Sequence, residues 1–160
     1  MLTLTQIARF FHDLAFTTWI GSMIFMMIVL TPAVGAKGIP PQFLRLMGIE
    51  RFKNWAWASI AVLAVTGTYR IYGRFYMFDL FVMTSYGKLM LLKISLFLIM
   101  VFLTAIVSLN YARRIPAEAP QRPGEQPTPG FTGMQNRFIW FSAVNLFLGI
   151  SILFIMAIIR

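Results

Sequence analysis

The sequence predicts an all-α integral membrane protein, a four-helix bundle with up-down topology that forms one domain over residues 1–160. Three observations predict this fold. Hydrophobic residues make up 59% of the chain and charged residues only 12%, whereas about a quarter of a soluble domain is charged. The mean hydropathy is +0.75. Four apolar runs each approach the ~20 residues that an α-helix needs to cross about 30 Å of hydrocarbon.

The four apolar runs cover about residues 7–30, 55–72, 86–109 and 138–159. Backbone amides in lipid must find partners within their own segment, so each run is predicted to be a helix. Strands are disfavoured because the runs are long and their apolar and polar residues do not alternate with a period of two. The first run is longer than the apolar core of a cleaved signal peptide, and we expect it to stay in the protein as a helix.

The three connections differ in character. In the first, Pro40-Pro41 precedes residues 42–47, which we interpret as a short helix lying in the membrane interface. The second, residues 74–85, is short and aromatic, as suits the level of the lipid headgroups. The third, residues 113–136, holds five of the eight prolines and is predicted to be a flexible linker.

The basic residues lie between the apolar runs, although a net charge of +9 would suggest nucleic acid in a soluble protein. This placement indicates contacts with anionic lipid and no nucleic-acid partner. The first and third connections with their flanks hold eight Lys and Arg, and the opposite side holds five, which predicts that both termini lie outside. The chain has no cysteine, which excludes disulfides and thiolate metal sites within it.

His12, the single histidine, lies one to two turns inside the first run, beside Asp13 and one turn after Arg9. An ionisable side chain at membrane depth usually faces the interior of the bundle and is a candidate functional residue. A neutral imidazole binds both copper and haem iron, so His12 is the first candidate for a metal or cofactor ligand. The alternative is an interfacial histidine, with Arg9 and Asp13 paired four residues apart.

Several soft or aromatic side chains share the His12 side of this helix. At about 100° per residue, those within about 60° of it are Trp19, Met23, Met26 and Met27. A histidine with thioethers would suit Cu(I), so Met23 is a second metal candidate and Trp19 a candidate cofactor contact. His12 and Met27 are ~22 Å apart along a helix and cannot share one ion. Packing, or a series of relay sites, is the alternative role of the methionines.

Lys93 interrupts the third apolar run, and several side chains share its face. These are Tyr86, Met100, Thr104 and Tyr111. A polar stripe of this kind should point away from lipid, which makes Lys93 and Tyr86 candidates for cofactor binding. Lys93 could then pair with Asp13 or Asp79, or contact a propionate or another anion. The alternative is a lysine that reaches back to the interface near Lys88.

Small and polar pairs four residues apart suggest where helices contact each other. Asn145 and Gly149 form such a pair in the fourth run, and Thr17 and Gly21 in the first; packing is the favoured role for both. The sequence contains no phosphate-binding loop, nucleophile elbow, His-Glu-x-x-His or cluster of carboxylates. An enzymatic activity is therefore the less favoured interpretation.

Three stretches carry a resemblance to a known family. They are Phe11-His12 followed by Trp19-Ile20-Gly21-Ser22, Arg51-Phe52 followed by Thr66-Gly67, and Thr84-Ser85-Tyr86-Gly87-Lys88-Leu89-Met90-Leu91-Leu92-Lys93 followed by Leu109-Asn110. Together they resemble the membrane domains of copper-resistance protein D (CopD-like) proteins, and the third stretch is the most specific. The resemblance extends over about residues 8–110, whereas the fourth run is similar only in being apolar.

The resemblance implies a four-helix domain at the bacterial cytoplasmic membrane that takes part in copper uptake or copper handling. The related HemJ-like protoporphyrinogen oxidases share this layout, carry haem b and have a second histidine in their first helix, where this chain has His12 alone. The leading hypothesis is a CopD-like protein that handles copper or a haem-type redox cofactor. The alternatives are a non-catalytic structural subunit of a larger respiratory or photosynthetic complex, and a HemJ-like enzyme. Expected partners are the lipid bilayer and other membrane proteins or further copies of the chain.

Overall fold

The computed structural model is all-α throughout the residues that it describes, which are 3–30, 32, 49–72, 78–111, 114–118 and 128–158. Two short helices in this part of the chain are α5 (Phe78–Met83) and α7 (Arg114–Glu118). The long helices are α1 (Leu4–Ile24), continued by a π-helix, η1 (Phe25–Leu30), α4 (Ile49–Tyr72), α6 (Ser85–Asn110) and α8 (Pro129–Ile158). The predicted all-α class is confirmed.

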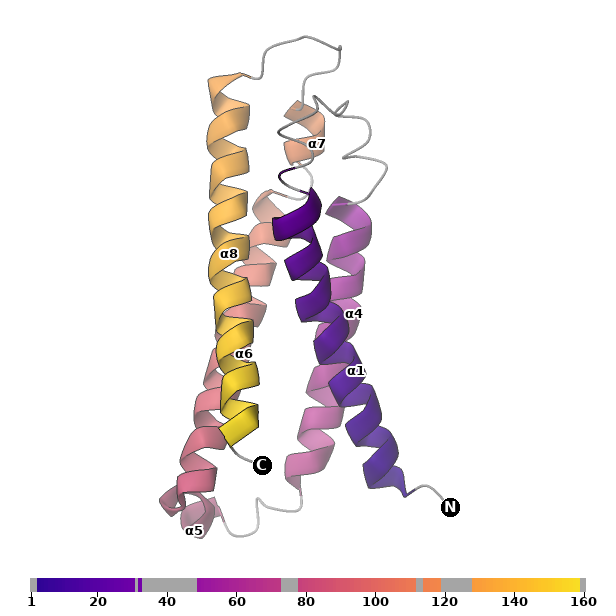
Figure 1. Cartoon of the computed structure of the whole chain (residues 1–160), viewed down its shortest axis with the longest axis vertical. Helices are drawn as coiled ribbons and strands as arrows, with labels where there is room; N and C mark the ends of the chain where they lie inside the picture. The colour runs from indigo at the N-terminus through magenta and orange to yellow at the C-terminus, as the bar shows by residue number, and fades with distance from the viewer. Residues whose placement is uncertain are drawn as a thin grey trace.

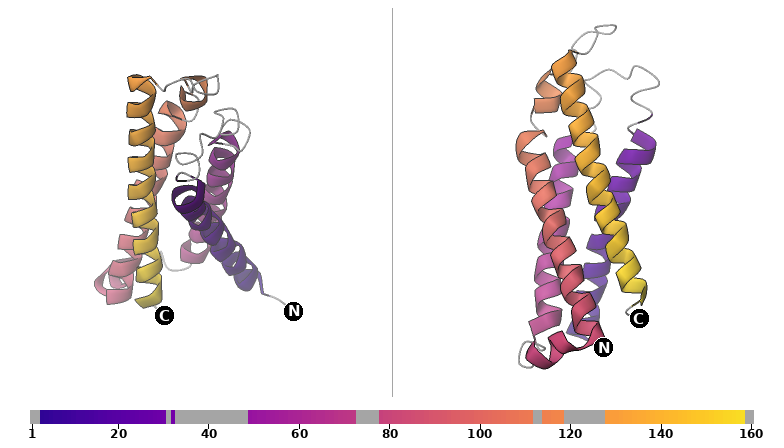
Figure 2. Two further views of the ribbon diagram at one scale, coloured as in Figure 1. Left: turned by 45° about the horizontal axis from the view of Figure 1, so that its top comes forward. Right: turned by 90° about the vertical axis from the view of Figure 1, so that its left-hand side faces the viewer.

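The long helices alternate in direction, so that α1 begins and α8 ends at the same end of the molecule (Figure 1). α1 packs mainly against α4, and α6 packs mainly against α8. Fewer contacts join α1 to α8 and α4 to α6. The molecule therefore consists of two antiparallel helix pairs that lie together in an elongated bundle, as two further views show (Figure 2).

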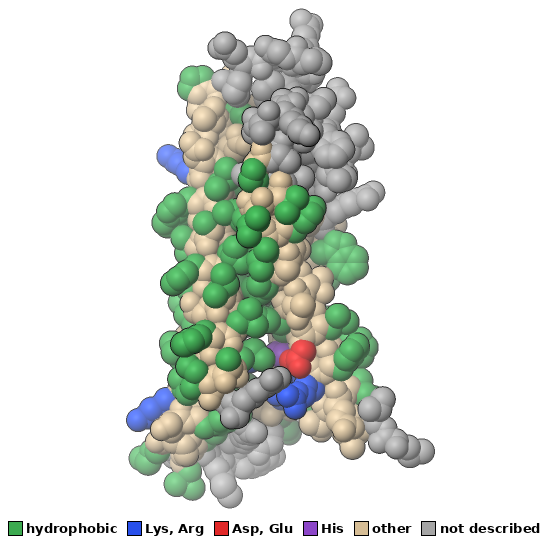
Figure 3. All heavy atoms as spheres, viewed as in Figure 1, with side chains coloured by type: hydrophobic (Ala, Val, Ile, Leu, Met, Phe, Trp, Pro, Cys, Tyr) green, Lys and Arg blue, Asp and Glu red, His purple; other side chains and the backbone are tan. Residues whose placement is uncertain are grey.

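Three of the described helices are long and apolar enough to cross a membrane, over Leu4–Val29, Ser85–Asn110 and Pro129–Ile158. α4 has the length but is more polar, because its first turns contain charged residues and its last turn contains Arg70. On the face drawn in Figure 3, hydrophobic side chains cover the middle of the molecule and charged side chains lie toward its two ends. The chain is an integral membrane protein, and this surface suits contact with a lipid bilayer.

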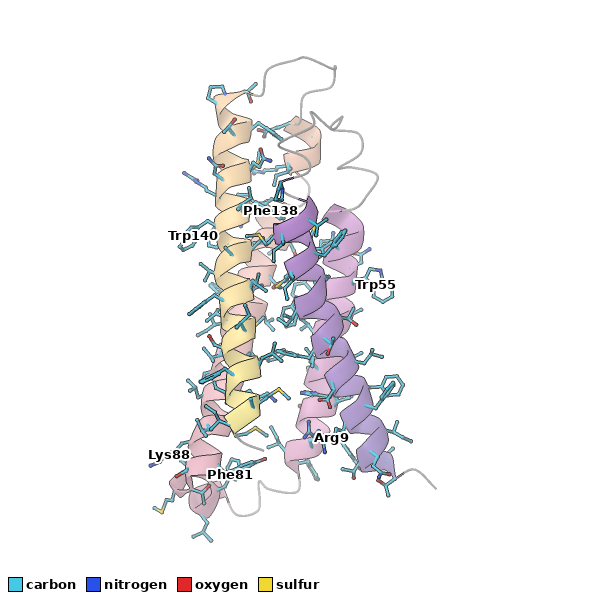
Figure 4. The ribbon with its side chains drawn as sticks, viewed as in Figure 1. Arg9, Trp55, Phe81, Lys88, Phe138 and Trp140 are labelled. Atoms are coloured by element: carbon cyan, nitrogen blue, oxygen red, sulfur yellow. The ribbon has the colours of Figure 1, made fainter. Side chains whose placement is uncertain are left out.

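Two tryptophans lie on the outer surface of the bundle. Trp55 on α4 and Trp140 on α8 point away from the helices on opposite sides (Figure 4), and they are 66% and 60% exposed. Arg9, Phe81 and Lys88 lie toward the other end, where α1 begins (Figure 4). Exposed tryptophans and basic side chains in these positions are typical of the two levels at which a membrane protein meets the lipid headgroups.

Capping side chains start two of the long helices earlier than the apolar runs suggest. The Gln6 amide donates to the Thr3 hydroxyl (3.3 Å) and the Thr3 amide donates to the Gln6 side chain (2.9 Å). This capping box starts α1 before residue 7. The Phe131 amide donates to the Thr128 hydroxyl (3.2 Å), and Pro129 takes the first helical position of α8, where no N–H is needed.

The prediction of a linker over residues 113–136 was wrong over its last part. α8 begins at Pro129 rather than near residue 138, because Thr128 caps the helix there. The short helix α7 also lies within the predicted linker. α4 begins at Ile49, before its apolar run. The interfacial helix predicted over residues 42–47 lies outside the described residues.

α5 and α6 meet at a corner built around the carbonyl oxygen of Phe81. That oxygen accepts hydrogen bonds from the Thr84 amide (3.1 Å) and the Thr84 hydroxyl (2.7 Å). The Thr84 hydroxyl also caps α6 by accepting from the Gly87 amide (3.0 Å). A β-carbon at Gly87 would overlap the backbone of Phe81, so the corner requires glycine. The connection predicted over residues 74–85 therefore contains a helix.

The core lies between the four long helices. Its largest fully buried side chains are Trp19, Met100 and Ile152. Three side-chain hydrogen bonds each join a different helix pair. They are His12 with Thr66 between α1 and α4 (2.8 Å), Trp57 with Ser108 between α4 and α6 (3.2 Å), and Asn145 with Thr104 between α6 and α8 (2.9 Å). The predicted contact role of Asn145 is thus confirmed.

Glycines show where helices approach each other closely. A β-carbon at Gly149 would overlap the Ile20 side chain, so α8 lies tight against α1 at this point and the predicted packing role of Gly149 is confirmed. The same role is wrong for Thr17 and Gly21. Both are exposed, and no heavy atom of another described segment lies within 4 Å of a β-carbon built at Gly21.

Candidate metal or cofactor site

His12 projects from α1 toward the interior of the bundle and is 9% exposed. Its Nδ1 lies 2.8 Å from Oγ1 of Thr66 on α4. The Thr66 hydroxyl donates its single proton to the Val62 carbonyl at 2.6 Å, a bond that threonine commonly makes within a helix. Because that proton is used, Thr66 Oγ1 accepts the hydrogen bond from His12 Nδ1–H.

This hydrogen bond fixes the tautomer of the neutral imidazole. With the proton on Nδ1, the Nε2 atom of His12 keeps its lone pair and can accept a proton, a hydrogen bond or a metal ion. A histidine that binds metal through one ring nitrogen usually donates its other N–H to a nearby acceptor. Gly67 lies beside the ring, since a β-carbon there would be in ordinary van der Waals contact with His12 Cε1, at 3.6 Å. Thr66 therefore orients His12.

His12 lines a cavity of about 350 Å³ between α1, α4, α6 and α8, which we call the His12 cavity. Most of its lining is apolar. Its polar lining side chains are His12, Thr68, Arg70 and Lys93, and a thioether is supplied by Met90. A cavity of this kind suits a ligand with an apolar body and a polar or anionic group placed at one end.

Lys93 is half-buried and lines the His12 cavity. Met100 and Thr104 on the same side of α6 are buried, so the predicted inward stripe is present over these residues, whereas its member Tyr86 is exposed. Asp13 forms its ion pair with Arg9 (3.8 Å) and not with Lys93. The Asp79 side chain lies outside the described part of the chain. Lys93 thus places a positive charge at the cavity, and a buried charge of this kind favours an anionic neighbour.

Trp19 and Met23 lie away from the His12 cavity. Both are buried and line a second cavity of about 40 Å³, together with Met26 and Met27. His12 and Met23 are eleven residues apart in α1, which corresponds to about 16 Å along an α-helix. The structure therefore places the two metal candidates at separate positions, and they cannot bind one ion together.

Tyr86 is not brought together with His12 and Lys93. It lies in the first turn of α6, is 37% exposed and is not among the residues that line the His12 cavity. Its ring packs edge-on against Phe81, with 5.9 Å between the ring centroids. Its position assigns it to the corner between α5 and α6.

Three residues of the site were not predicted. Thr66 orients His12, and Gly67 and Arg70 line its cavity. A signal for them exists in the sequence. Thr66 and Arg70 are four residues apart in the last part of α4, so they share a face, and polar side chains on one face of a membrane helix indicate the side turned inward.

Among the described residues, no three His, Asp or Glu side chains gather as a metal-binding group. The family model of copper resistance protein D, CopD, matches residues 46–159, well over half of the chain. The chain belongs to the CopD family. No curated protein and no solved structure matches it.

The CopD match confirms the family that the sequence resembles but extends over different residues. It includes α8, whose apolar run resembles CopD-like domains only in being apolar, and it leaves out α1. Thr66, Arg70 and Lys93 lie inside the matched segment, whereas His12 lies before it. The family region therefore supplies the α4 and α6 walls of the His12 cavity, and the imidazole that these walls hold comes from outside it.

Proposed function

We propose that this CopD family membrane protein handles copper as its cargo at the bacterial cytoplasmic membrane, with His12 as the primary ligand through Nε2. Copper resistance is the property for which the matching family is named. The hydrogen bond from His12 to Thr66 carries the proposal, because it leaves the other ring nitrogen unprotonated. The bundle is proposed to cross the bilayer four times, with both termini outside.

The arrangement of α4 supports a fourth crossing. α4 runs antiparallel to α1 and packs along it (Figure 1). Its polar residues Ser59 and Thr66 are buried or half-buried against the other helices, while Val62 and Val65 are exposed. In the middle of α4 the polar side chains are thus turned inward and exposed positions are apolar, which matches the requirement of a lipid environment.

Imidazole nitrogen and thioether sulfur are ligands that suit Cu(I). The His12 cavity offers both, from His12 and Met90. Further along α1, the side chains of Met23, Met26 and Met27 line the second cavity. We propose that copper binds in the His12 cavity, because the separation of the two cavities along α1 prevents a single shared site.

Positive charge at the His12 cavity affects how copper binds there. Arg70 and Lys93 line the cavity and repel a bare cation, while they attract an anion. We therefore expect these two charges to weaken the binding of copper as a cation at His12.

Copper binding by the purified protein tests the proposal. Competition for Cu(I) against a chelator of known affinity is expected to show a site that His12→Ala removes. Thr66→Val is expected to weaken the affinity about tenfold or more, because removing the partner of a metal-bound histidine typically costs ten- to a hundred-fold.

Thr68→Val is the matched control. Thr68 lines the same cavity, but Thr66 is the residue that holds His12, so this variant should bind copper as the wild type does. A wild-type protein that binds no copper, or a His12→Ala variant that keeps the wild-type affinity, would contradict the proposal.

A haem-type redox cofactor is the second candidate, and it is favoured by the two cations at the His12 cavity. The residues fit such a group: His12 Nε2 would bind the iron on one side, Arg70 and Lys93 would contact the carboxylates, and the apolar lining would surround the ring. Haem would supply a one-electron redox centre when bound. An absorption spectrum of the oxidised and reduced protein tests this, since a Soret band lost in His12→Ala would support it and a colourless wild type would exclude it.

A further inference from the structure

Two buried polar atoms have no hydrogen-bond partner within the described part of the chain. They are Nε1 of Trp19 on α1 and Oδ1 of Asn145 on α8. The two side chains are 1% and 4% exposed, and both line the second cavity of about 40 Å³. Leaving a donor or an acceptor buried and unpaired destabilises a protein, so this pair of atoms requires an explanation.

Turning the Asn145 amide or the Trp19 ring does not give these atoms hydrogen-bond partners. The Asn145 amide nitrogen donates to Thr104 Oγ1 at 2.9 Å, which uses one end of the amide group. Turning the amide around would move its oxygen to Thr104 and leave its N–H groups unpaired instead. The Trp19 ring packs edge-on against Phe97, with ring centroids 6.2 Å apart and planes at 87°. Both groups are held where they lie.

We propose that this cavity is a binding site for about one or two ordered water molecules, which accept a hydrogen bond from Trp19 Nε1–H and donate one to Asn145 Oδ1. The volume is sufficient, because a buried water needs roughly 10–15 Å³ of such space and two to four polar neighbours. Ser108 and Ser142 also line the cavity and supply further hydroxyl groups.

The chemistry of the lining favours water over other small ligands. A donor that faces an acceptor is satisfied only by a molecule that both accepts and donates. A cation is opposed by the indole N–H of Trp19 and by Lys53, which also lines the cavity. An apolar guest would leave both Trp19 and Asn145 unpaired.

This water would supply a polar link that the contact between α1 and α8 otherwise lacks. Direct side-chain hydrogen bonds join α1 to α4, α4 to α6 and α6 to α8, but none joins α1 to α8 among the described residues. In lipid, helix contacts depend on close packing and polar links, so the water closes the ring of four helices. The inference does not depend on the copper proposal.

Nuclear magnetic resonance of protein labelled with ¹⁵N in detergent micelles tests the site. The four tryptophans give separate indole N–H signals, and Trp19→Phe identifies that of Trp19. We expect a cross-peak between Trp19 Nε1–H and water, with the sign of a water molecule that stays bound longer than the protein tumbles. Asn145→Leu, which lacks the amide oxygen, should weaken this cross-peak about twofold or more.

Ser151→Ala is the matched control on α8, because the Ser151 hydroxyl donates to the Phe147 carbonyl of its own helix (2.9 Å); it should leave the cross-peak unchanged. A wild-type Trp19 signal without water contact, or a cross-peak that is unchanged in Asn145→Leu, would overturn the proposal. If Asn145→Leu does not fold, a crystal structure of the wild type that resolves waters decides. Density within hydrogen-bond distance of both atoms supports the site, and an empty cavity or a direct bond from Trp19 to Asn145 refutes it.

Discussion

Thr66 determines which nitrogen of His12 is available for binding. Its hydroxyl donates to the Val62 carbonyl and therefore accepts from His12 Nδ1–H. If the hydroxyl donated to the imidazole instead, the proton of the neutral ring would sit on Nε2, and that nitrogen could not bind a metal. The choice of tautomer thus follows from a helix hydrogen bond on α4 rather than from any charge near the ring.

Lys93 is the residue that separates the two candidate functions. Lys93→Met removes a positive charge from the His12 cavity and keeps an apolar stem of similar length. If copper binds there as a cation, the affinity for Cu(I) should rise by about tenfold or more, because the charge that is removed repels a cation. If a haem-type cofactor binds there, the variant should retain less pigment. Both are measured on the same preparation, by chelator competition and by absorption.

Lys88→Met is the control for this comparison, since Lys88 is exposed near the start of α6 and does not line the cavity. It should change neither copper affinity nor pigment. An equal effect of the two substitutions would indicate a general change in surface charge, and the role given to Lys93 would be wrong.

The inward direction of His12 could be predicted from its sequence alone, because an ionisable group at membrane depth avoids lipid. Its partner could not. Thr66 is 54 residues away in the chain, and the meeting of the two side chains depends on how α1 crosses α4. The separation of Met23 from His12 was visible in the helical rise, whereas the assignment of Tyr86 to the α5–α6 corner required the position of α5.

At the scale of helices, α1 and α8 pack closely against each other at Gly149. A β-carbon at Gly149 would overlap Cδ1 of Ile20, which is 3% exposed and cannot easily turn away. Gly149→Ala should therefore destabilise the bundle by about 1–3 kcal/mol, as overpacking of a core usually does. The measurement is thermal or denaturant-induced unfolding in detergent, followed by the loss of helix signal.

A second substitution makes this prediction specific. Ile20→Val deletes the Cδ1 atom that would collide, so the double variant should be more stable than the sum of the two single changes implies. Gly21→Ala, at an exposed glycine with open space around it, should have little effect. Destabilisation of equal size in Gly21→Ala and Gly149→Ala would show that glycine acts through backbone flexibility and not through the contact.

All four long helices could be predicted to exist, because each contains a long apolar run that lipid obliges to be helical. Their starts could not be read from hydropathy alone. Thr3 with Gln6 and Thr128 with Pro129 are local signals that extend α1 and α8 beyond their apolar parts. The corner at Gly87 was unforeseen for a similar reason, since it depends on a carbonyl of a short helix that hydropathy does not reveal.

At the scale of the whole molecule, α1 begins and α8 ends at the same end of the bundle (Figure 1). Because successive long helices run in opposite directions, two ends on the same side of the bundle agree with an even number of membrane crossings. α4 is then a spanning helix. Three crossings by the most apolar helices alone would place the start of α1 and the end of α8 on opposite sides of the bilayer.

Labelling of single cysteines distinguishes these topologies, and the absence of native cysteine makes it direct. Thr5→Cys and Ala157→Cys, both at exposed positions, should react from outside with a membrane-impermeant maleimide. Thr132→Cys, exposed near the start of α8, should react only after the membrane is permeabilised. The direction follows from the larger number of basic residues predicted to be inside. Labelling of Thr5→Cys and Ala157→Cys from opposite sides would contradict four crossings.

The π-helix at the end of α1 gives the first crossing a place where one residue can be lost. A π-turn closes hydrogen bonds five residues apart instead of four, so Phe25–Leu30 holds a surplus residue relative to an α-helix. Loss of one residue there lets the amides pair again at α-helical spacing, with none left unpaired in lipid. The same loss within α1 would rotate every later side chain by about 100°. Loss of one residue from η1 should therefore disturb the bundle less than loss of one residue from α1.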